Sequence, residues 1–354
     1  MMENSPTQLD HYRLLGRSGL RVSPLSLGTM TFGMKGWGTD QEEAERILNH
    51  YMEFGGNFID TANYYANGES EKMLGRLIAP KREQLVVATK YSLTMNKGDP
   101  NAAGNHRKNM VQSVEASLRR LKTDFIDLFY LHLWDNFTPA EEILRAFDDL
   151  VRAGKILYVG ISDTPAWQVS RLQAIADLRG WSPLVALQIP YNLTERTVER
   201  EYMPMAREMG LGILPWSPLA GGVLSGKYTR DDLNVKPANM DSRKNINLAT
   251  GRLTEQALEI ADVVVAVAEE LDVGPAQVAL AWTLQNPAVT SPIMGTRTFS
   301  QLEENIKALS VQFTADQIAR LQAVSRIDAC FPNNLIDTPT SEMMFGQVKI
   351  AKRR

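Results

Sequence analysis

The sequence is poor in the residues that build disulfide frameworks and metal sites. Its 354 residues include a single cysteine, Cys330, which excludes an internal disulfide and a zinc site made of several cysteines. The four histidines, at positions 11, 50, 106 and 132, are too widely scattered to match a metal-binding motif. We therefore expect no bound metal.

Long apolar runs and an excess of positive charge are also absent. No stretch of about 18 apolar residues occurs, so no membrane-spanning helix is predicted. The first residues lack the apolar core of a signal peptide. A net charge of -3 and a pI of about 5.9 argue against a nucleic-acid partner. We expect a soluble cytoplasmic protein that binds a small molecule, and the sequence allows a homo-oligomer.

Short apolar segments alternate with amphipathic segments along most of the chain. The predicted strands are residues 24–29, 57–62, 85–91, 125–132, 157–162, 185–191, 211–217 and 291–295. The predicted helices are residues 40–54, 70–77, 108–121, 139–153, 165–178, 198–209, 255–271, 275–285 and 301–309. Because a helix between two strands returns the chain to the same end of a sheet, the strands should pair in parallel.

Eight such strand–helix units predict an α/β fold of the (β/α)8 or TIM-barrel type. Length alone suggests about two domains, but one barrel accounts for residues 1–354 as a single domain. The alternative is a doubly wound sheet, which usually carries a G-x-G-x-x-G turn after its first strand. Here Gly28 is followed by Thr-Met-Thr-Phe, so the barrel is favoured.

Three segments depart from the alternating pattern. Residues 10–23 predict a β-hairpin that closes the bottom of the barrel. Residues 218–250 predict a long irregular loop after the seventh strand, a kind of loop that is usually functional or a linker. Residues 330–354 form a C-terminal tail that is basic at its end and is expected to contribute to the substrate site.

Ionisable residues end three successive predicted strands. Barrel enzymes carry their chemistry at these carboxyl ends, where Asp60, Lys90 and His132 lie. Each residue alone has an ordinary explanation: Asp60 as a turn cap, Lys90 in solvent, His132 in the core. Because side chains two apart share a face of a strand, all three can point into the barrel together. Their combination predicts an active site.

A tyrosine beside these residues makes the set suitable for proton donation. The loop after the second strand carries Tyr64 and Tyr65, and an isolated tyrosine has a pKa of about 10. An ammonium group such as that of Lys90 lowers this pKa, and Asp60 can hold Lys90 charged. His132 can donate a hydrogen bond to a carbonyl oxygen. We therefore expect protonation of an oxygen whose carbon accepts a hydride.

These segments resemble the aldo-keto reductase superfamily, in its aryl-alcohol-dehydrogenase-like and potassium-channel-β-subunit-like branches. Residues 58–71 are similar to the second-strand signature of that family, and the segments ending at Lys90 and His132 are similar to its third and fourth strands. The resemblance covers about residues 12–335. The catalytic residues that it implies are Tyr65, as proton donor, with Asp60, Lys90 and His132.

The resemblance implies NADPH (NADP+) as cofactor, bound in an extended form over the barrel mouth. The implied cofactor-binding residues are Thr29, Met30, Asp60, Ser162, Asp163, Gln188, Trp216, Ser217, Pro218, Leu219, Gly222, Lys227, Arg243, Gly295, Thr296, Arg297, Gln301, Glu304 and Asn305. Arg297 is the expected clamp for the 2′-phosphate. Asp163 stands where the family has asparagine, and a carboxylate cannot donate a hydrogen bond to the carboxamide oxygen.

The expected activity is the NADPH-dependent reduction of aldehydes or ketones to alcohols. The expected substrate pocket is walled by Phe32, Tyr64, Tyr65, Trp134 and Phe331. One alternative is a non-catalytic NADPH-binding regulatory subunit similar to the channel β subunits, although those lack the histidine found here at position 132. Another is a ketoreductase that acts on a sugar or a secondary metabolite. A barrel lyase that forms a Schiff base on Lys90 is a third.

Overall fold

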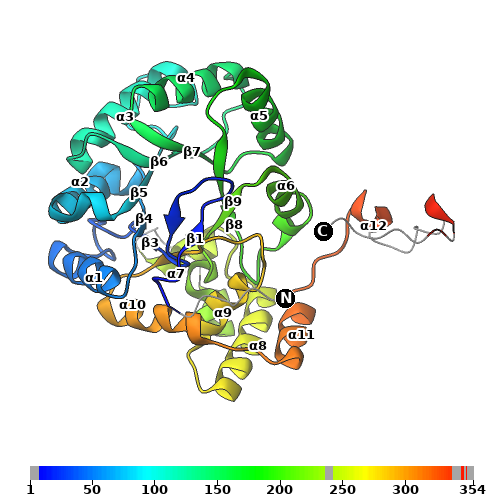
Figure 1. Cartoon of the computed structure of the whole chain (residues 1–354). Coiled ribbons are helices and arrows are strands. Elements are labelled where there is room, and N and C mark those ends of the chain that lie inside the picture. The colour runs from blue at the N-terminus through cyan, green and yellow to red at the C-terminus, as the bar shows by residue number, and fades with distance from the viewer. Residues whose placement is uncertain (1–7, 236–241, 337–343, 347, 349–354) are drawn as a thin grey trace.

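Eight parallel strands form one sheet that winds into a nearly closed barrel surrounded by helices (Figure 1). The computed structural model describes residues 8–235, 242–336, 344–346 and 348. The barrel strands are β3 (Ser26–Gly28), β4 (Phe58–Asp60), β5 (Val86–Tyr91), β6 (Ile126–Leu131), β7 (Ile156–Ser162), β8 (Leu184–Pro190), β9 (Gly212–Trp216) and β10 (Ile293–Gly295). The predicted (β/α)8 barrel is therefore confirmed.

Helices follow the barrel strands, and most of them surround the barrel (Figure 1). They are α1 (Gln41–Glu53), α2 (Glu69–Ile78), α3 (Arg107–Leu121), α4 (Ala140–Arg152), α5 (Ala166–Arg179), α6 (Tyr202–Met209), α7 (Arg243–Ala249), α8 (Glu255–Leu271), α9 (Pro275–Leu284), α10 (Phe299–Ile306), α11 (Ala315–Val324) and α12 (Asn333–Ile336). In the described ranges, no helix is both long and apolar enough to cross a membrane.

Local sequence signals set several of the helix ends. The Asp40 side chain accepts a hydrogen bond from the backbone N–H of Glu43 at 3.0 Å and so caps the start of α1. Gly55, Gly154 and Gly210 follow α1, α4 and α6 with φ values of +86°, +69° and +68°. Glycine adopts this left-handed conformation without steric cost, so each residue turns the chain from a helix toward the next strand.

The ring of strands closes between β9 and the segment that precedes β10. Ile213 of β9 pairs in parallel with Val289, and the backbone N–H of Thr290 donates to the Ile213 carbonyl at 2.8 Å. Since β10 pairs with β3, the sheet has almost no free edge. Closure in this way brings the carboxyl ends of all eight strands around one mouth.

An antiparallel hairpin fills the opposite end of the barrel, as predicted for residues 10–23. Its strands are β1 (Arg13–Leu14) and β2 (Arg21–Val22), and it lies inside the ring of strands in Figure 1. Leu15 and Val22 are fully buried against inward-facing residues of the barrel. A Cβ at Gly16 would lie 2.3 Å from the Val185 carbonyl oxygen, so only glycine allows this close approach.

The barrel interior contains the residues that the period-two pattern predicts to face inward. Phe58, Val86, Ala88, Leu128 and Tyr130 belong to one buried cluster with the hairpin. A separate, larger cluster fills the space between the outer faces of the strands and the helices. The next inward positions on the same faces of β4, β5 and β6 are therefore directed at the mouth.

The segment after β9 is more regular than the sequence indicated. Residues 218–250, expected as an irregular loop, contain two 3₁₀ helices, η4 (Ala220–Ser225) and η5 (Arg230–Asn234), followed by α7. Residues 236–241 lie outside the described part of the chain. In the C-terminal tail, residues 337–343, 347 and 349–354 also lie outside it.

Candidate active site

Asp60 and Lys90 form a buried ion pair at the carboxyl ends of β4 and β5. Lys90 Nζ lies 2.5 Å from Asp60 Oδ1 and donates a second hydrogen bond to the Thr61 carbonyl at 2.8 Å. Gln188, from β8, donates its Nε2 to Asp60 Oδ2 at 2.7 Å. Lys90 is 0% exposed and Asp60 is 2% exposed. The two charges therefore compensate each other inside the protein, where neither could remain alone without a large desolvation cost.

Tyr65 lies next to this pair and receives a hydrogen bond from it. Lys90 Nζ donates to Tyr65 Oη at 3.3 Å. Because an ammonium group can only donate, this bond occupies a lone pair of the phenol and leaves the phenolic proton for another acceptor. Tyr65 begins η1 (Tyr65–Gly68), in which Ala66 and Asn67 have φ values of +48° and +56°. Such strained backbone is common at functional sites.

The protonation states of Tyr65 and Lys90 follow from burial and charge together. Burial raises the pKa of Tyr65 above its ordinary value, and the Lys90 charge acts in the opposite direction without outweighing it. The sequence analysis expected a net lowering, which is wrong for the free protein because burial is invisible in the sequence. Burial by itself lowers the pKa of Lys90, but the Asp60 carboxylate outweighs it and the net shift is upward. At neutral pH both groups therefore keep their protons.

His132 follows β6 and faces the edge of the Tyr65 ring. The two ring centroids are 5.9 Å apart, with an interplanar angle of 82°. Burial, with a smaller contribution from the Lys90 charge, lowers the pKa of His132 to about 3. The imidazole is therefore neutral near pH 7. A neutral imidazole carries one N–H, which can donate a hydrogen bond but adds no charge to the site.

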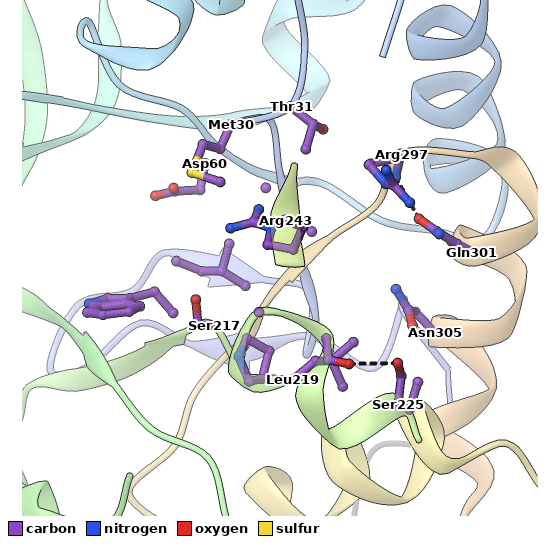
Figure 2. A pocket seen from close by; sticks show the side chains of 18 of the residues that line it. Met30, Thr31, Asp60, Ser217, Leu219, Ser225, Arg243, Arg297, Gln301 and Asn305 are labelled. Carbon is purple, nitrogen blue, oxygen red and sulfur yellow. Dashed lines mark hydrogen bonds between the residues drawn. The ribbon is translucent and has the colours of Figure 1, made fainter. Parts of the chain in front are cut away.

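A cleft of about 350 Å³ extends from these residues across the mouth of the barrel (Figure 2). The predicted site residues that line it are Met30, Asp60, Tyr65, Gln188, Trp216, Ser217, Pro218, Leu219, Gly222, Lys227, Arg243, Gly295, Arg297, Gln301, Glu304 and Asn305. The lining residues that the sequence analysis missed are Gly28, Thr31, Gly221, Ser225, Ala276, Ile293 and Ser300.

Some of the missed residues carried a usable signal. Thr31 and Ser300 are small polar residues next to or between predicted site residues, and Ser225 belongs to the glycine-rich run after β9. Ala276, near the start of α9, carried none. Only the packing of α9 beside the segment after β9 brings it to the cleft.

Four predicted cofactor residues lie outside the lining of the cleft. Thr29 is fully buried and donates its hydroxyl to the Asp60 carbonyl at 3.1 Å, so it supports the strand end. The hydroxyl oxygens of Ser162 and Thr296 are buried without a hydrogen-bond partner among the described residues. Unpaired buried polar atoms are rare and mark places where a ligand or water is expected. Asp163 Oδ1 instead accepts a hydrogen bond from Trp216 Nε1 at 3.0 Å.

The predicted substrate wall is only partly assembled around the cleft. Tyr65 lines it, while Phe32 is fully buried in the outer core and faces away from it. Trp134 is partly buried against the same core, and Tyr64 is 49% exposed beside the mouth. Phe331 is 78% exposed in the tail. The structure thus does not bring Phe32 or Phe331 to the cleft, because core packing takes one side chain and the tail carries the other away.

Three cations converge on the end of the cleft that is remote from Tyr65. Lys227, Arg243 and Arg297 line it and form no ion pair with a carboxylate within the described ranges. Burial lowers the pKa of Lys227, and the charges of Arg297 and Arg243 lower it further. Mutual repulsion of this kind indicates a site for an anion, which would neutralise all three groups.

A glycine-rich turn completes this cationic end. Gly221 and Gly222 have φ values of +67° and +90°, and a Cβ at Gly222 would lie 2.7 Å from Lys227 Nζ. The absence of side chains lets an anion approach the backbone N–H groups and the lysine together. The residues present therefore fit a phosphate-bearing dinucleotide. Cations and glycines lie at one end, and Trp216 lies at the other, near the unpaired Ser162 hydroxyl at the end of β7.

Comparison with known proteins identifies the family. The Aldo/keto reductase family model matches residues 24–326. The chain is 36% identical to norsolorinic acid reductase of Aspergillus flavus, over 95% of this chain and 86% of the relative. It is 35% identical to the putative aryl-alcohol dehydrogenase AAD14 of Saccharomyces cerevisiae, over 94% of this chain and 91% of the relative. It is also 35% identical to aryl-alcohol dehydrogenase [NADP(+)] of Phanerodontia chrysosporium, over 92% of this chain and 89% of the relative. With a barrel whose mouth holds a buried lysine–aspartate pair beside a tyrosine, this chain belongs to the aldo/keto reductase family of oxidoreductases.

Proposed function

We propose that this protein reduces aldehydes or ketones to alcohols with NADPH, and that Tyr65 donates the proton. The observation that carries the proposal is the hydrogen bond from Lys90 Nζ to Tyr65 Oη at 3.3 Å, made while the same ammonium binds Asp60. Burial keeps the phenol protonated, and the hydrogen bond from Lys90 directs the phenolic hydrogen away from Lys90, toward the cleft.

Reduction of a carbonyl requires a hydride at the carbon and a proton at the oxygen. When bound, the reduced nicotinamide supplies the hydride. Tyr65 transfers its proton to the carbonyl oxygen, and the phenolate that remains is stabilised by the ammonium of Lys90. Asp60 keeps that ammonium charged, and neutral His132 donates a hydrogen bond that polarises the carbonyl. The products are an alcohol and the oxidised dinucleotide.

The proposed dinucleotide site uses both ends of the cleft. Lys227, Arg243 and Arg297 supply positive charge for the phosphates, with Gln301 and Asn305 at the adenosine end. In this proposal Trp216 stacks on the nicotinamide ring, and Gln188 and the unpaired Ser162 hydroxyl bind its carboxamide. The name of one relative, aryl-alcohol dehydrogenase [NADP(+)], includes this cofactor, which supports the choice of NADPH.

Aromatic carbonyl compounds are the substrates that we propose to test first. Tyr64 is half-exposed next to Tyr65 in the chain, and Trp134 follows β6 at the same end of the barrel, so both are candidates for an aromatic wall. Several relatives are named for aryl alcohols, which are the products of aryl aldehyde reduction. Keto groups on sugars or secondary metabolites remain a second substrate class for the same chemistry.

The test measures loss of NADPH absorbance with a panel of aryl aldehydes, dicarbonyls and keto-sugars. Tyr65→Phe should lower kcat by about 100-fold or more, the ordinary contribution of a general acid, and should leave NADPH affinity unchanged. The adjacent Tyr64→Phe is the matched control and should retain turnover. Undiminished turnover in Tyr65→Phe would refute the mechanism. Stoichiometric NADPH binding without turnover of any substrate would favour a regulatory protein.

A further inference from the structure

A tight loop between β3 and α1 crosses the cationic end of the cleft. We call residues 31–39 the Trp37 loop. The backbone N–H of Thr39 donates to the Thr31 carbonyl at 2.8 Å, and that of Gly33 donates to the Thr39 carbonyl at 3.0 Å. A Cβ at Gly38 would lie 2.3 Å from the Met34 carbonyl oxygen. The loop is therefore a closed turn that fixes where Trp37 is presented.

The Trp37 loop is tied to the strand end that carries Arg297. Thr39 Oγ1 donates to the Arg297 carbonyl at 3.2 Å, and Thr31 Oγ1 donates to the Thr296 carbonyl at 3.0 Å. Figure 2 shows Thr31 close to Arg297, with Arg243 nearer the centre of the cleft. Two hydrogen bonds therefore fix the base of the loop to the backbone at Thr296 and Arg297.

The tip of the same loop contacts the second arginine. The Arg243 guanidinium carbon lies 4.6 Å from the centroid of the Trp37 ring, within the range of a cation–π interaction. Arg243 comes from α7, which is more than 200 residues later in the chain. One loop thus contacts two arginines, Arg243 and Arg297, that lie 54 positions apart in the sequence.

Arg243 needs such a contact because its own surroundings repel it. Burial lowers its pKa, and the charges of Arg252 and Arg297 lower it further, with only Tyr228 opposing them. None of the described carboxylates pairs with Arg243. An aromatic face stabilises a guanidinium without neutralising it, so the full charge of Arg243 stays available to a ligand.

We propose that Trp37 is a positioning residue that holds Arg243 beside Arg297 and thereby sets the preference for a dinucleotide carrying a 2′-phosphate. The inference rests on the proposed use of NADPH. Two guanidinium groups held in place before binding match the oxygens of one phosphate dianion. Prior placement lowers the ordering cost of binding and so raises affinity for the phosphate-bearing ligand alone.

Two mononucleotides that differ by one phosphate provide the test. Calorimetric binding of 2′,5′-ADP and of 5′-AMP is measured for the wild type, Trp37→Ala and Trp37→Phe. Trp37→Ala should weaken 2′,5′-ADP binding by about 3- to 30-fold, the range of a partly desolvated cation–π contact. It should leave 5′-AMP binding unchanged, and Trp37→Phe should retain most of the affinity. Trp37 is only partly buried, and a thermal unfolding scan confirms that each variant folds.

A double-mutant cycle with Arg243→Gln separates positioning from a merely structural role. If Trp37 acts through Arg243, then Trp37→Ala should cause no further loss in the Arg243→Gln background. Equal weakening of both mononucleotides, or a full additional loss in that background, would overturn the inference. If the wild type binds 2′,5′-ADP no more tightly than 5′-AMP, the proposed cofactor preference itself fails. If the wild type prefers 2′,5′-ADP over 5′-AMP and Trp37→Ala has the same preference, only the proposed role of Trp37 fails.

Discussion

The two ends of the cleft treat positive charge in opposite ways. At the Tyr65 end, Lys90 is fully buried and bonded to Asp60, the Thr61 carbonyl and Tyr65. At the other end, Lys227 is exposed and Arg243 is partly buried. Both lack a carboxylate partner among the described residues, and neighbouring cations lower the pKa of each. The first charge is satisfied within the protein, while the others are left for a ligand.

The contrast separates what the protein does by itself from what it does with a bound molecule. A buried ion pair with full hydrogen bonding is complete before any ligand arrives, so its removal should damage the fold. An uncompensated cationic cluster should cost stability until an anion binds, so its removal should damage binding and spare the fold. Substitutions at the two ends should therefore have different effects on folding and on binding.

Removal of the buried lysine should have the largest effect. Lys90→Met leaves the Asp60 carboxylate buried without its cation and should lower the free energy of unfolding by about 3–5 kcal/mol, measured by urea denaturation. Adding Asp60→Asn to Lys90→Met removes the unpaired charge and should restore much of the stability. A single variant as stable as the wild type would show that the pair does not support the fold.

Acid should expose the cost of keeping His132 neutral. Its pKa is lowered to about 3 by burial, and an unfolded histidine titrates near 6.5. Between these values the unfolded chain binds the extra proton, so stability is present above about pH 6.5 and is lost as the pH falls. The contribution should change by about 1.4 kcal/mol per pH unit.

The His132→Gln variant isolates that contribution from the carboxylates, which also titrate in acid. Between about pH 7 and 4, the free energy of unfolding of the wild type should fall more steeply with decreasing pH than that of His132→Gln. Parallel curves would show that the imidazole is not held neutral in the folded protein.

Removal of one cation from the other end should reduce binding without harming the fold. Arg297→Gln should weaken NADPH binding by about 10-fold or more, the ordinary value of a charge-assisted hydrogen bond, and should have little effect on NADH. The thermal midpoint of the free protein should not decrease, because repulsion with Lys227 and Arg243 is relieved. Arg179→Gln, at an exposed helix end, is the control. A destabilised Arg297→Gln would contradict the contrast drawn above.

The smallest effect is expected at Asp163, which accepts a hydrogen bond from Trp216 at the end of the cleft opposite the cations. Asp163→Asn keeps an oxygen that accepts from Trp216 Nε1 and should change kcat by only a few-fold. Asp163→Ala removes the acceptor and should reduce turnover by about 5-fold, with a shift in the tryptophan fluorescence spectrum. Equal effects of both variants would show that the carboxylate acts through charge and not by orienting the indole.

Period-two alternation was the sequence signal that located the catalytic end. Because it places Phe58 with Asp60 and Ala88 with Lys90, the inward direction of both charged residues followed from strand assignment alone. The upward shift of the Tyr65 pKa did not follow, since the depth of a loop residue depends on how neighbouring strand ends enclose it. Phe32 was misplaced for a similar reason: a pattern gives residue type but not which of two apolar spaces a loop side chain fills.

The cationic end was less predictable because it is assembled from segments remote in sequence. Lys227 and Arg297 were found through the family resemblance, but the stacking of Trp37 on Arg243 depends on how a loop after the first barrel strand meets a helix after the seventh. No local sequence pattern predicts such a contact. Family signatures therefore identify the charged residues, while the side chains that hold those residues in place are visible only in the fold.

The hairpin at the base of the barrel determines from which side ligands can enter. Leu15 and Val22 of the hairpin pack among the inward-facing side chains, so in the described part of the chain the base of the barrel is closed. The mouth at the other end is then the entrance to the phenol of Tyr65 in this part of the chain. A nucleotide and a carbonyl compound that bind as proposed would share that entrance, so each would restrict the access of the other.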